Sequence, residues 1–333
     1  VEEVDWQQFS IDIPAGDHQL GWWFDAGSGT PGGAGWVDEV VFQPQVQVTN
    51  TADAGANSLR DVITRASAGN VITFDPGLSG QTSTLTQGTL AIDKALTIDA
   101  SNLPDGITIS GDTNNNGVPD AGDVRVFNIG GNANVVLKGI KVTGGYGGCI
   151  SNSGYLELID STVSGCTTST FGGGIYNSGG RLILTNSTVS DNQAGIYGGG
   201  IANFSLAALT LINSTVSGNQ ADFGGGIFSA NQATIVHSTV SNNRADTSGG
   251  GMSYAGAGAD LMIENSIIAG NMAGSDPDFY METGLPTLSG VNLIGSHDTL
   301  ELSLPVGHGQ LIGTLTAPLG PRLNPLGDYT GPT

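Results

Sequence analysis

The sequence predicts an all-β fold in which the chain winds as a parallel solenoid of about ten coils. Five times between Gly147 and Asn271, a glycine cluster is followed by an apolar residue and, later, by a short β-like phrase such as Asn186–Val189. The last apolar residue of that phrase recurs at spacings of 26, 27, 24 and 28 residues. A period in the twenties is typical of solenoids, because one repeat can bury its apolar face only against the next.

Short apolar runs extend the solenoid on both sides of the regular copies, so it is predicted over residues 46–317. In Ser58–Arg65, Leu59, Val62 and Ile63 share one helical face and Ser58 can cap the helix. A cap at 58–66 would cover the open end of the solenoid. Further strands are expected at Val46–Asn50, Val71–Phe74, Leu90–Ile92, Leu96–Ile98, Ile107–Ile109, Val124–Ile129, Val135–Leu137, Ile140–Val142, Val291–Ile294 and Leu311–Leu315.

The two ends of the chain differ in composition from the solenoid. All four tryptophans lie within the first 36 residues, and this region alternates like strands. We therefore expect residues 1–45 to form a small antiparallel, jelly-roll-like strand set. It is too short to close a sandwich, so it packs on the solenoid, pairs with another chain, or belongs to a truncated domain. Residues 318–333 are rich in proline and glycine and are expected to be irregular.

The charge and the cysteine content of the chain restrict its binding partners and the cellular compartment in which it works. Nine Lys and Arg residues stand against 30 Asp and Glu residues, giving a net charge of −21, which disfavours nucleic acid and anionic membranes. Such acidity suits a calcium-rich exterior. There is no run of 18 apolar residues, so no membrane insertion is expected. Cys149 and Cys166 fall within one repeat, where either a disulfide or two buried thiols would fit.

Several motifs resemble those of bacterial CSLREA-type surface proteins. They are Ser58–Ala66, Ile109-Ser-Gly-Asp112, the Gly-Gly-Gly-Ile and Asn-Ser-Thr-Val repeats, Val291–Gly295 and the closing Pro318–Thr333. Asn57 replaces the cysteine of the family name. The glycine motif is also similar to that of polymorphic outer-membrane adhesins, although their Phe-x-x-Asn motif does not recur regularly here. The resemblance implies a secreted or cell-surface, right-handed parallel β-helix, mostly without assigned activity.

The repeat also predicts ladders of equivalent polar residues, about 4.8 Å apart on neighbouring coils. Their amides can bond to the coils above and below, and asparagine tolerates the left-handed backbone of corners. Outward Thr-x-Ser pairs, such as Thr188 and Ser190, make ice binding a remote alternative. The three columns are Asn152, Asn177, Asn203; Asp160, Asn186, Asn213, His237, Asn265; and Cys166, Asn192, Asn219, Asn243, Asn271.

The sharpest site signal is the segment 112–123, which has the oxygen spacing of a calcium loop. Gly117 stands at its sixth position, and strands flank the loop where helices are usual. Asp123 occupies the twelfth position in place of the usual glutamate. We predict structural Ca²⁺ here; Asp276–Asp278 is a weaker candidate that also suits a turn. The predicted ligands are Asp112, Asn114, Asn116, the Val118 carbonyl, Asp120 and Asp123.

No catalytic constellation is predicted. Basic residues are scattered without a lyase motif: Arg125, Lys138, Lys141, Arg181 and Arg244. Gly307-His-Gly309 lacks the companion motifs of polygalacturonases, and no local motif surrounds any histidine.

The leading expectation is therefore a non-enzymatic structural or adhesive protein, with head-to-tail self-association into filaments as a sub-hypothesis. The alternative is a protein that binds or degrades polysaccharides, with surface glycans as partners. An aromatic-lined groove with paired carboxylates would favour the alternative.

Overall fold

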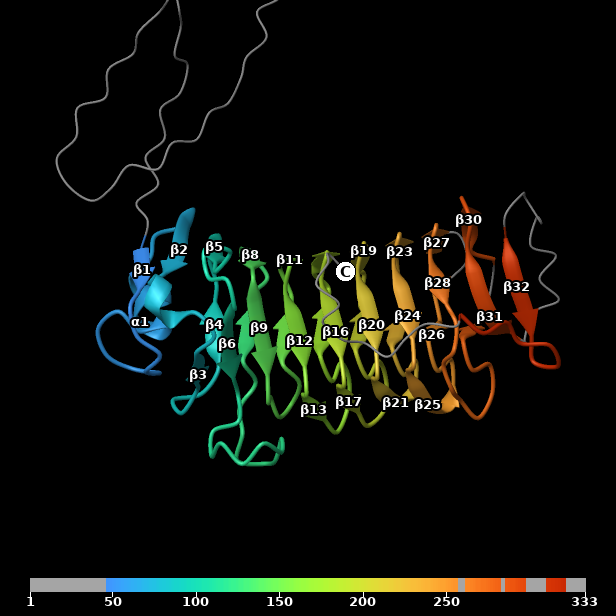
Figure 1. Cartoon of the computed structure of the whole chain (residues 1–333), viewed down its shortest axis with the longest axis horizontal. Coiled ribbons are helices and arrows are strands. Elements are labelled where there is room, and N and C mark those ends of the chain that lie inside the picture. Colours follow the sequence, from blue (N-terminus) through green and yellow to red (C-terminus); the bar gives the residue numbers. More distant parts are fainter. Residues whose placement is uncertain (1–45, 257–260, 283–284, 298–309, 322–333) are drawn as a thin grey trace, which may run out of the picture. The chain divides into compact units, whose positions relative to one another are not determined.

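The computed structural model describes residues 46–256, 261–282, 285–297 and 310–321. The chain divides into two units, Val1–Phe42 and Gln43–Thr333, and the described residues all belong to the second. The expectations for 1–45 and for most of the tail lie outside the described residues. Within the described part, the chain forms an all-β parallel solenoid of about nine coils, as the period predicts (Figure 1).

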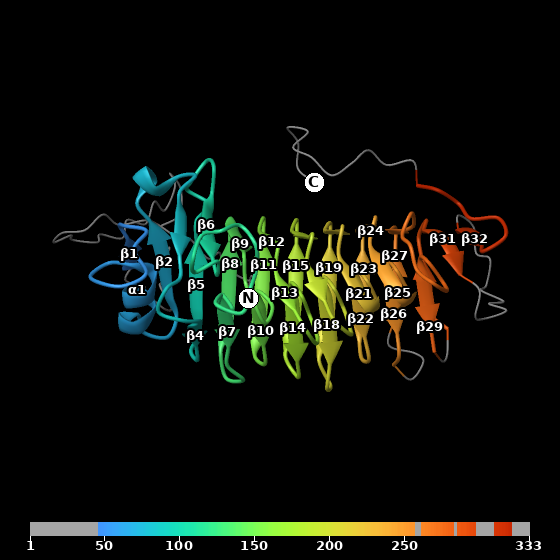
Figure 2. The same cartoon turned by 90° about the horizontal axis from the view of Figure 1, so that it is seen from below.

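Each regular coil passes through sheets C, A, B and D in turn, and all the strand pairs between successive coils are parallel (Figure 2). Sheet A contains β1 (Val46–Val48), β2 (Asn70–Phe74), β5 (Leu96–Asp99), β8 (Asn134–Lys138), β11 (Tyr155–Ile159), β15 (Arg181–Thr185), β19 (Ala208–Ile212), β23 (Ala233–Val236), β27 (Leu261–Glu264) and β30 (Thr287–Ser289). Sheet B contains β3 (Thr82–Thr84), β6 (Ile107–Ser110), β9 (Ile140–Thr143), β12 (Thr162–Ser164), β16 (Thr188–Ser190), β20 (Thr215–Ser217), β24 (Thr239–Ser241), β28 (Ile267–Ile268), β31 (Leu293–His297) and β32 (Leu311–Thr314).

The two shorter sheets complete the coil. Sheet C contains β4 (Leu90–Ile92), β7 (Phe127–Ile129), β10 (Ile150–Asn152), β14 (Ile175–Ser178), β18 (Ile201–Phe204), β22 (Ile227–Ser229), β26 (Met252–Tyr254) and β29 (Phe279–Met281). Sheet D contains β13 (Thr167–Thr168), β17 (Gln193–Ala194), β21 (Gln220–Phe223) and β25 (Arg244–Ser248).

The predicted strands are found with small shifts, and the apolar repeat position forms the core. The closing valines Val163, Val189, Val216 and Val240 are in register and buried. The sequence pattern did not predict β3 because its residues, Thr-Ser-Thr, offer no apolar run. It also missed the strands of sheet D, which are only two to five residues long.

The cap helix is present as predicted. Helix α1 (Leu59–Arg65) begins after Ser58, whose side chain accepts a hydrogen bond from the Asp61 amide. Leu59, Val62 and Ile63 are buried in the core of the solenoid. Lys94 donates to the carbonyls of Thr64 and Ala66 at the C-terminal end of the helix, where the helix dipole favours a cation. The open apolar end is therefore covered by a helix that is tied to the next coil.

The glycine triplets have two distinct physical roles. The first glycine of a triplet, such as Gly198 with a φ of 65°, adopts the left-handed conformation that corners require. The second, Gly199, lies so close to the following coil that a Cβ would overlap the carbonyl oxygens of Gln220 and Gly225. The triplet is thus needed for coil-to-coil contact as well as for the turn.

Cys149 and Cys166 form a disulfide in the core, with their Cα atoms 5.5 Å apart. Of the two possibilities left open by the sequence, the structure therefore has the cross-link. It joins the start of β10 to the corner after β12 and so closes one coil.

The three predicted polar columns form ladders. Asn152 donates to Asn177, and Asn177 to Asn203, through buried side-chain amides at 2.8 Å each. The outer column has φ near 48°, and bonds there include Asn213 to Asn186 at 2.8 Å. In the third column each asparagine donates to the side-chain oxygen of the next.

A fourth ladder was not predicted. It consists of the serines of the Asn-Ser-Thr-Val phrase, whose hydroxyls accept from the backbone N–H of the preceding coil, as in Ser187 N–H to Ser214 Oγ at 3.1 Å. Serine also suits an exposed turn, so its sequence pattern alone does not indicate burial.

Candidate functional site

The predicted calcium loop projects from the coil between β6 and β7 (Figure 1). The Asp112 carboxylate accepts hydrogen bonds from the backbone N–H groups of Asn116 and Gly117, at 3.1 and 2.7 Å. Asp123 closes the loop by accepting from the N–H groups of Thr113 and Asp120, at 2.9 and 2.8 Å. The first and last carboxylates of the predicted ligand set thus hold the loop in a ring.

The middle positions of the loop converge on one another. The side-chain amides of Asn114 and Asn116 donate to Oδ2 of Asp120, at 3.2 and 3.0 Å. These bonds, together with one from the Gly122 N–H, which has the largest effect, lower the pKa of Asp120. Hydrogen bonds within the loop thus connect the five polar residues of the predicted ligand set. Val118 is exposed, and its N–H donates to Asn116 Oδ1 at 2.8 Å.

The negative charge of the loop has no ion-pair partner within the part of the chain that the structure describes. Asp112 and Asp123 are each only 7% exposed. The four ion pairs among the described residues all lie elsewhere. Among the described residues, no three His, Cys, Asp or Glu side chains are grouped as a ready metal site. A cation here would therefore need the amide oxygens of Asn114 and Asn116 and the Val118 carbonyl as well, which is the donor set that Ca²⁺ prefers.

The weaker candidate, Asp276–Asp278, has a structural place. Asp276 has a φ of 47°, as a turn requires, and Asp278 is buried as the terminal acceptor of the third ladder. Asp278 accepts from Asn271 and from Ser296. Its carboxylate is thus occupied by protein donors.

The sequence patterns missed a cluster of six aromatic rings, which we call the aromatic corner. It fills the angle between the turns that follow sheet D and the outer face of sheet C. Its ring centroids lie 4.3 to 6.1 Å apart. Phe171 and Tyr197, in the turns after β13 and β17, and Phe223, at the end of β21, form what we call the turn side of the corner. The other three members, Tyr176, Phe204 and Phe228, belong to sheet C.

The backbone of three successive coils builds this corner. Phe171, Tyr197 and Phe223 are bridged in register. Tyr176 and Phe228 flank Ala202 in one outward column of sheet C, and Ala202 is fully buried beneath the rings. Phe228 is 6% exposed and the other five rings are half-buried.

Polar groups border the aromatic corner. The hydroxyls of Tyr176 and Tyr197 take part in none of the hydrogen bonds formed within the described residues. Arg125 is half-buried, donates to the Gly147 carbonyl, and lies within electrostatic range of the Tyr176 side chain. Burial lowers the pKa of this guanidinium.

In the Thr-x-Ser pairs of β16, β20 and β24, which were predicted to point outward, only the threonines are partly exposed to solvent. Thr188, Thr215 and Thr239 are half-exposed on sheet B, but Ser190 and Ser217 are buried. The serines are covered because the chain turns immediately after them, at residues with positive φ such as Gly218. These described coils therefore lack a flat surface with two rows of exposed hydroxyls. Ice binding was suggested by such a surface, so the structure gives no support for it.

The basic residues considered for lyase chemistry lie apart. Lys138 pairs with Asp99 on sheet A, and Arg244 pairs with Asp246 at sheet D. Lys141 donates to the Asp105 carbonyl, and Arg181 is exposed at the start of β15. Gly307–Gly309 lies outside the described residues. The described basic residues thus form no common cluster.

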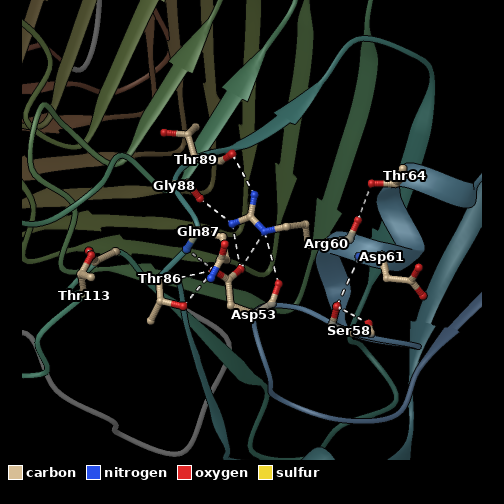
Figure 3. Close-up of polar contacts among 12 residues, drawn as sticks. Asp53, Ser58, Arg60, Asp61, Thr64, Thr86, Gln87, Gly88, Thr89 and Thr113 are labelled. Atoms are coloured by element: carbon tan, nitrogen blue, oxygen red, sulfur yellow. Dashed lines mark hydrogen bonds and ion pairs between the residues drawn. The ribbon is translucent and has the colours of Figure 1, made fainter.

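The best-connected charged pair belongs to the cap (Figure 3). Arg60 of α1 forms two hydrogen bonds to Asp53 Oδ1, at 2.9 and 2.7 Å, and donates to the carbonyls of Gly88 and Thr89. Asp53 Oδ2 accepts from the Thr86 N–H at 2.6 Å. This clasp fastens the helix to the first coils.

The comparisons with known proteins agree with this geometry. Residues 125–277 match the family model of a right-handed β-helix region. The solenoid is a right-handed parallel β-helix. The matched segment includes the disulfide and the aromatic corner, but not the 112–123 loop or α1. A search of curated proteins finds no matching relative. No helix among the described residues is long and apolar enough to cross a membrane.

Proposed function

We propose that this protein is a non-enzymatic, extracellular structural or adhesive β-helix of the bacterial surface type that its motifs resemble. The observation that carries the proposal is that the repeated polar residues are bonded between coils. Asn177, Asn219 and Ser214, for example, are buried in three different ladders. The repeat thus serves the scaffold, and recognition is left to the outer faces and loops.

Two further features support a setting outside the cell. The buried Cys149–Cys166 disulfide is of a kind that persists in oxidising compartments. The net charge of −21 keeps the surface hydrated and suits high concentrations of divalent cations. Detection of the intact protein on or outside its native cells, with protease sensitivity, tests this part; an exclusively intracellular location would reject it.

The proposal includes Ca²⁺ as a structural clamp in the 112–123 loop. Three carboxylates, Asp112, Asp120 and Asp123, lie in one short loop, and none of them forms an ion pair with a cationic side chain of the described residues. A bound ion would offset this charge and hold the loop between β6 and β7. Ca²⁺ at 100 times its Kd would stabilise the fold by about 2.7 kcal/mol.

Calcium titration by isothermal calorimetry, with thermal melts in Ca²⁺ and in EDTA, tests the clamp. We expect one site per chain and a lower Tm in EDTA. The double variant Asp112→Asn/Asp123→Asn should lose both effects. The matched control Asp105→Asn/Asp246→Asn changes the same net charge at surface positions and should keep them. An identical Tm with and without EDTA would remove calcium from the proposal.

Self-association belongs to the same proposal. β1 and β30 are the end strands of sheet A, and among the described strands each pairs on one side only. Stacking of β30 on β1 of a second copy would continue the parallel sheet. Sedimentation of the full chain at high concentration with Ca²⁺ should show assemblies, and electron microscopy should show filaments. A protein that stays monomeric under these conditions rejects this part.

A turnover assay distinguishes the non-enzymatic proposal from the alternative that the protein degrades polysaccharides. Hydrolase and lyase products are measured on a panel of neutral and uronate polysaccharides with Ca²⁺ present. We expect none. Turnover that is abolished by a single substitution in the solenoid would replace the non-enzymatic proposal.

A further inference from the structure

We propose that the aromatic corner is a binding site for a neutral, linear oligosaccharide. The inference rests on the proposed adhesive function and names its partner. Aromatic faces carry partial negative charge, so the positively polarised C–H groups on the flat side of a sugar ring stack on them. The corner repeats a half-buried aromatic ring on three successive coils, through Phe171, Tyr197 and Phe223.

The spacing of the rings suits a repeating polymer. Strands of neighbouring coils lie about 4.8 Å apart, so ring positions in register repeat along the solenoid axis at that step. Phe171, Tyr197 and Phe223 follow it, with centroids 5.6 and 5.4 Å apart. A linear chain of sugar rings that runs along the axis would meet one turn-side ring at each coil.

The size of the surface favours a small ligand over a protein partner. An aromatic side chain offers roughly 200 Å², so five half-buried rings expose no more than about 400 Å² together. A stable protein interface needs about 800 Å² on each partner. An apolar patch of a few hundred Å² is of the size of the largest patch on a typical monomer, and such patches are often functional.

The polar border points to a hydroxylated ligand. The Tyr176 and Tyr197 hydroxyls have no hydrogen-bond partner within the described residues, and both tyrosines belong to the cluster itself. Arg125 adds a half-buried donor near Tyr176. Sugar hydroxyls can accept from and donate to these groups. The net charge of −21 disfavours polyuronates and sulfated glycans, which leaves neutral chains.

The corner is a local departure from the repeat. In sheet C the outward column that holds Tyr176 and Phe228 has serine on either side, at Ser151 and Ser253. On the turn side, Ser248 pairs with Phe223. Packing of the coils therefore does not require aromatic residues at these positions.

The test measures binding of hexasaccharides to the full chain saturated with Ca²⁺. The probes are β-1,4-linked glucose, xylose, mannose and N-acetylglucosamine and β-1,3-linked glucose, with hexagalacturonate as the anionic comparison. Calorimetry should show binding of at least one neutral probe and at least tenfold weaker binding of hexagalacturonate. If no neutral probe binds, or if the galacturonate binds best, the proposal is overturned.

Three variants locate the site. Phe171→Ala should weaken the binding of the neutral probe at least tenfold. Tyr176→Phe/Tyr197→Phe keeps all six rings, so its Tm should not change, while affinity should fall about two- to tenfold through lost hydrogen bonds. Tyr280→Ala is the matched control, because it removes another half-buried ring of sheet C outside the cluster. Binding that is insensitive to the double variant and to Phe171→Ala would place the ligand elsewhere and reject the inference.

The outcome is independent of the other tests. Loss of calcium binding in Asp112→Asn/Asp123→Asn concerns a loop outside the corner, and the turnover assay concerns product formation. A negative glycan result therefore leaves the structural function standing, and a positive one survives failure of the calcium clamp.

Discussion

Asn271 donates both its backbone N–H and its side-chain Nδ2–H to one oxygen of Asp278, at 2.7 and 2.9 Å. The same two-donor contact links Asn192 to Asn219 and Asn243 to Asn271. The buried amides therefore all point one way along the solenoid, toward a carboxylate that ends the ladder. Ser296 donates to the other oxygen of that carboxylate at 2.9 Å.

Replacement of Asp278 by asparagine should change the pH dependence of stability. Burial is the main influence on the pKa of Asp278 and raises it, while bonds from Asn271 and Ser296 act in the opposite direction. A raised folded-state pKa means that stability is present below the unfolded-state pKa and is lost as pH rises through the folded-state value.

We therefore expect Asp278→Asn to be more stable than the wild type at pH 7 and equal or less stable near pH 3. The difference in the free energy of unfolding between the two proteins should change by at most about 1.4 kcal/mol per pH unit. Denaturant unfolding from pH 3 to 7.5 measures it. A constant difference across this range would show that the carboxylate does not titrate differently on folding.

Removal of one amide from the middle of this ladder should be costly. Oδ1 of Asn219 accepts both donors of Asn192, so Asn219→Ala leaves two buried N–H groups without partners, at about 1–3 kcal/mol each. Asn213→Gly is the control in the half-exposed outer ladder, because glycine keeps its φ of 49°. It should cost under about 1 kcal/mol. Similar losses in both variants would contradict the importance of burial.

The disulfide should contribute measurably to stability. Cys149 and Cys166 are 17 residues apart, and closing a loop of this length is worth about 3 kcal/mol. The double variant Cys149→Ala/Cys166→Ala should lose about that amount. Reductant should lower the midpoint of the wild type and leave the variant unchanged. Alkylation of both cysteines in the unfolded, unreduced protein would disprove the cross-link.

Loss of the clasp should loosen the cap. Asp53→Asn removes the charge that Arg60 binds, and Arg60 is only 24% exposed, so a loss of about 2–4 kcal/mol is expected after allowance for partial solvation. Hydrogen exchange should increase first in α1. Asp61→Asn, in an exposed pair with Arg65, is the comparison and should have little effect. Equal protection of α1 in the wild type and in Asp53→Asn would show that the clasp is dispensable.

The sequence pattern predicted features that depend on period or on short local spacing. The closing valines, the Asn ladders and the α1 face follow from recurrence, and the Asp112–Asp123 spacing is local. Part of the aromatic corner also follows the period, because Phe171, Tyr197 and Phe223 recur at a spacing of 26 residues. The sheet C rings follow it less well, because Ala202 interrupts the column of Tyr176 and Phe228. The recurrence of aromatic residues in three adjacent repeats was therefore an available signal, but it does not show which rings meet across the corner.

The sequence by itself determined the coil, because a repeat that cannot bury its own apolar face must stack on its copies. Only the tertiary structure decided what each column contacts. Asp278 lies seven residues after Asn271, yet it occupies the next place in the ladder, because a short turn brings it under that amide. Likewise, Phe171 and Phe204 meet at 5.3 Å only because the turn side and sheet C face one another across a corner. Such contacts depend on the register between coils and on the angle between sheets, which a one-dimensional period does not contain.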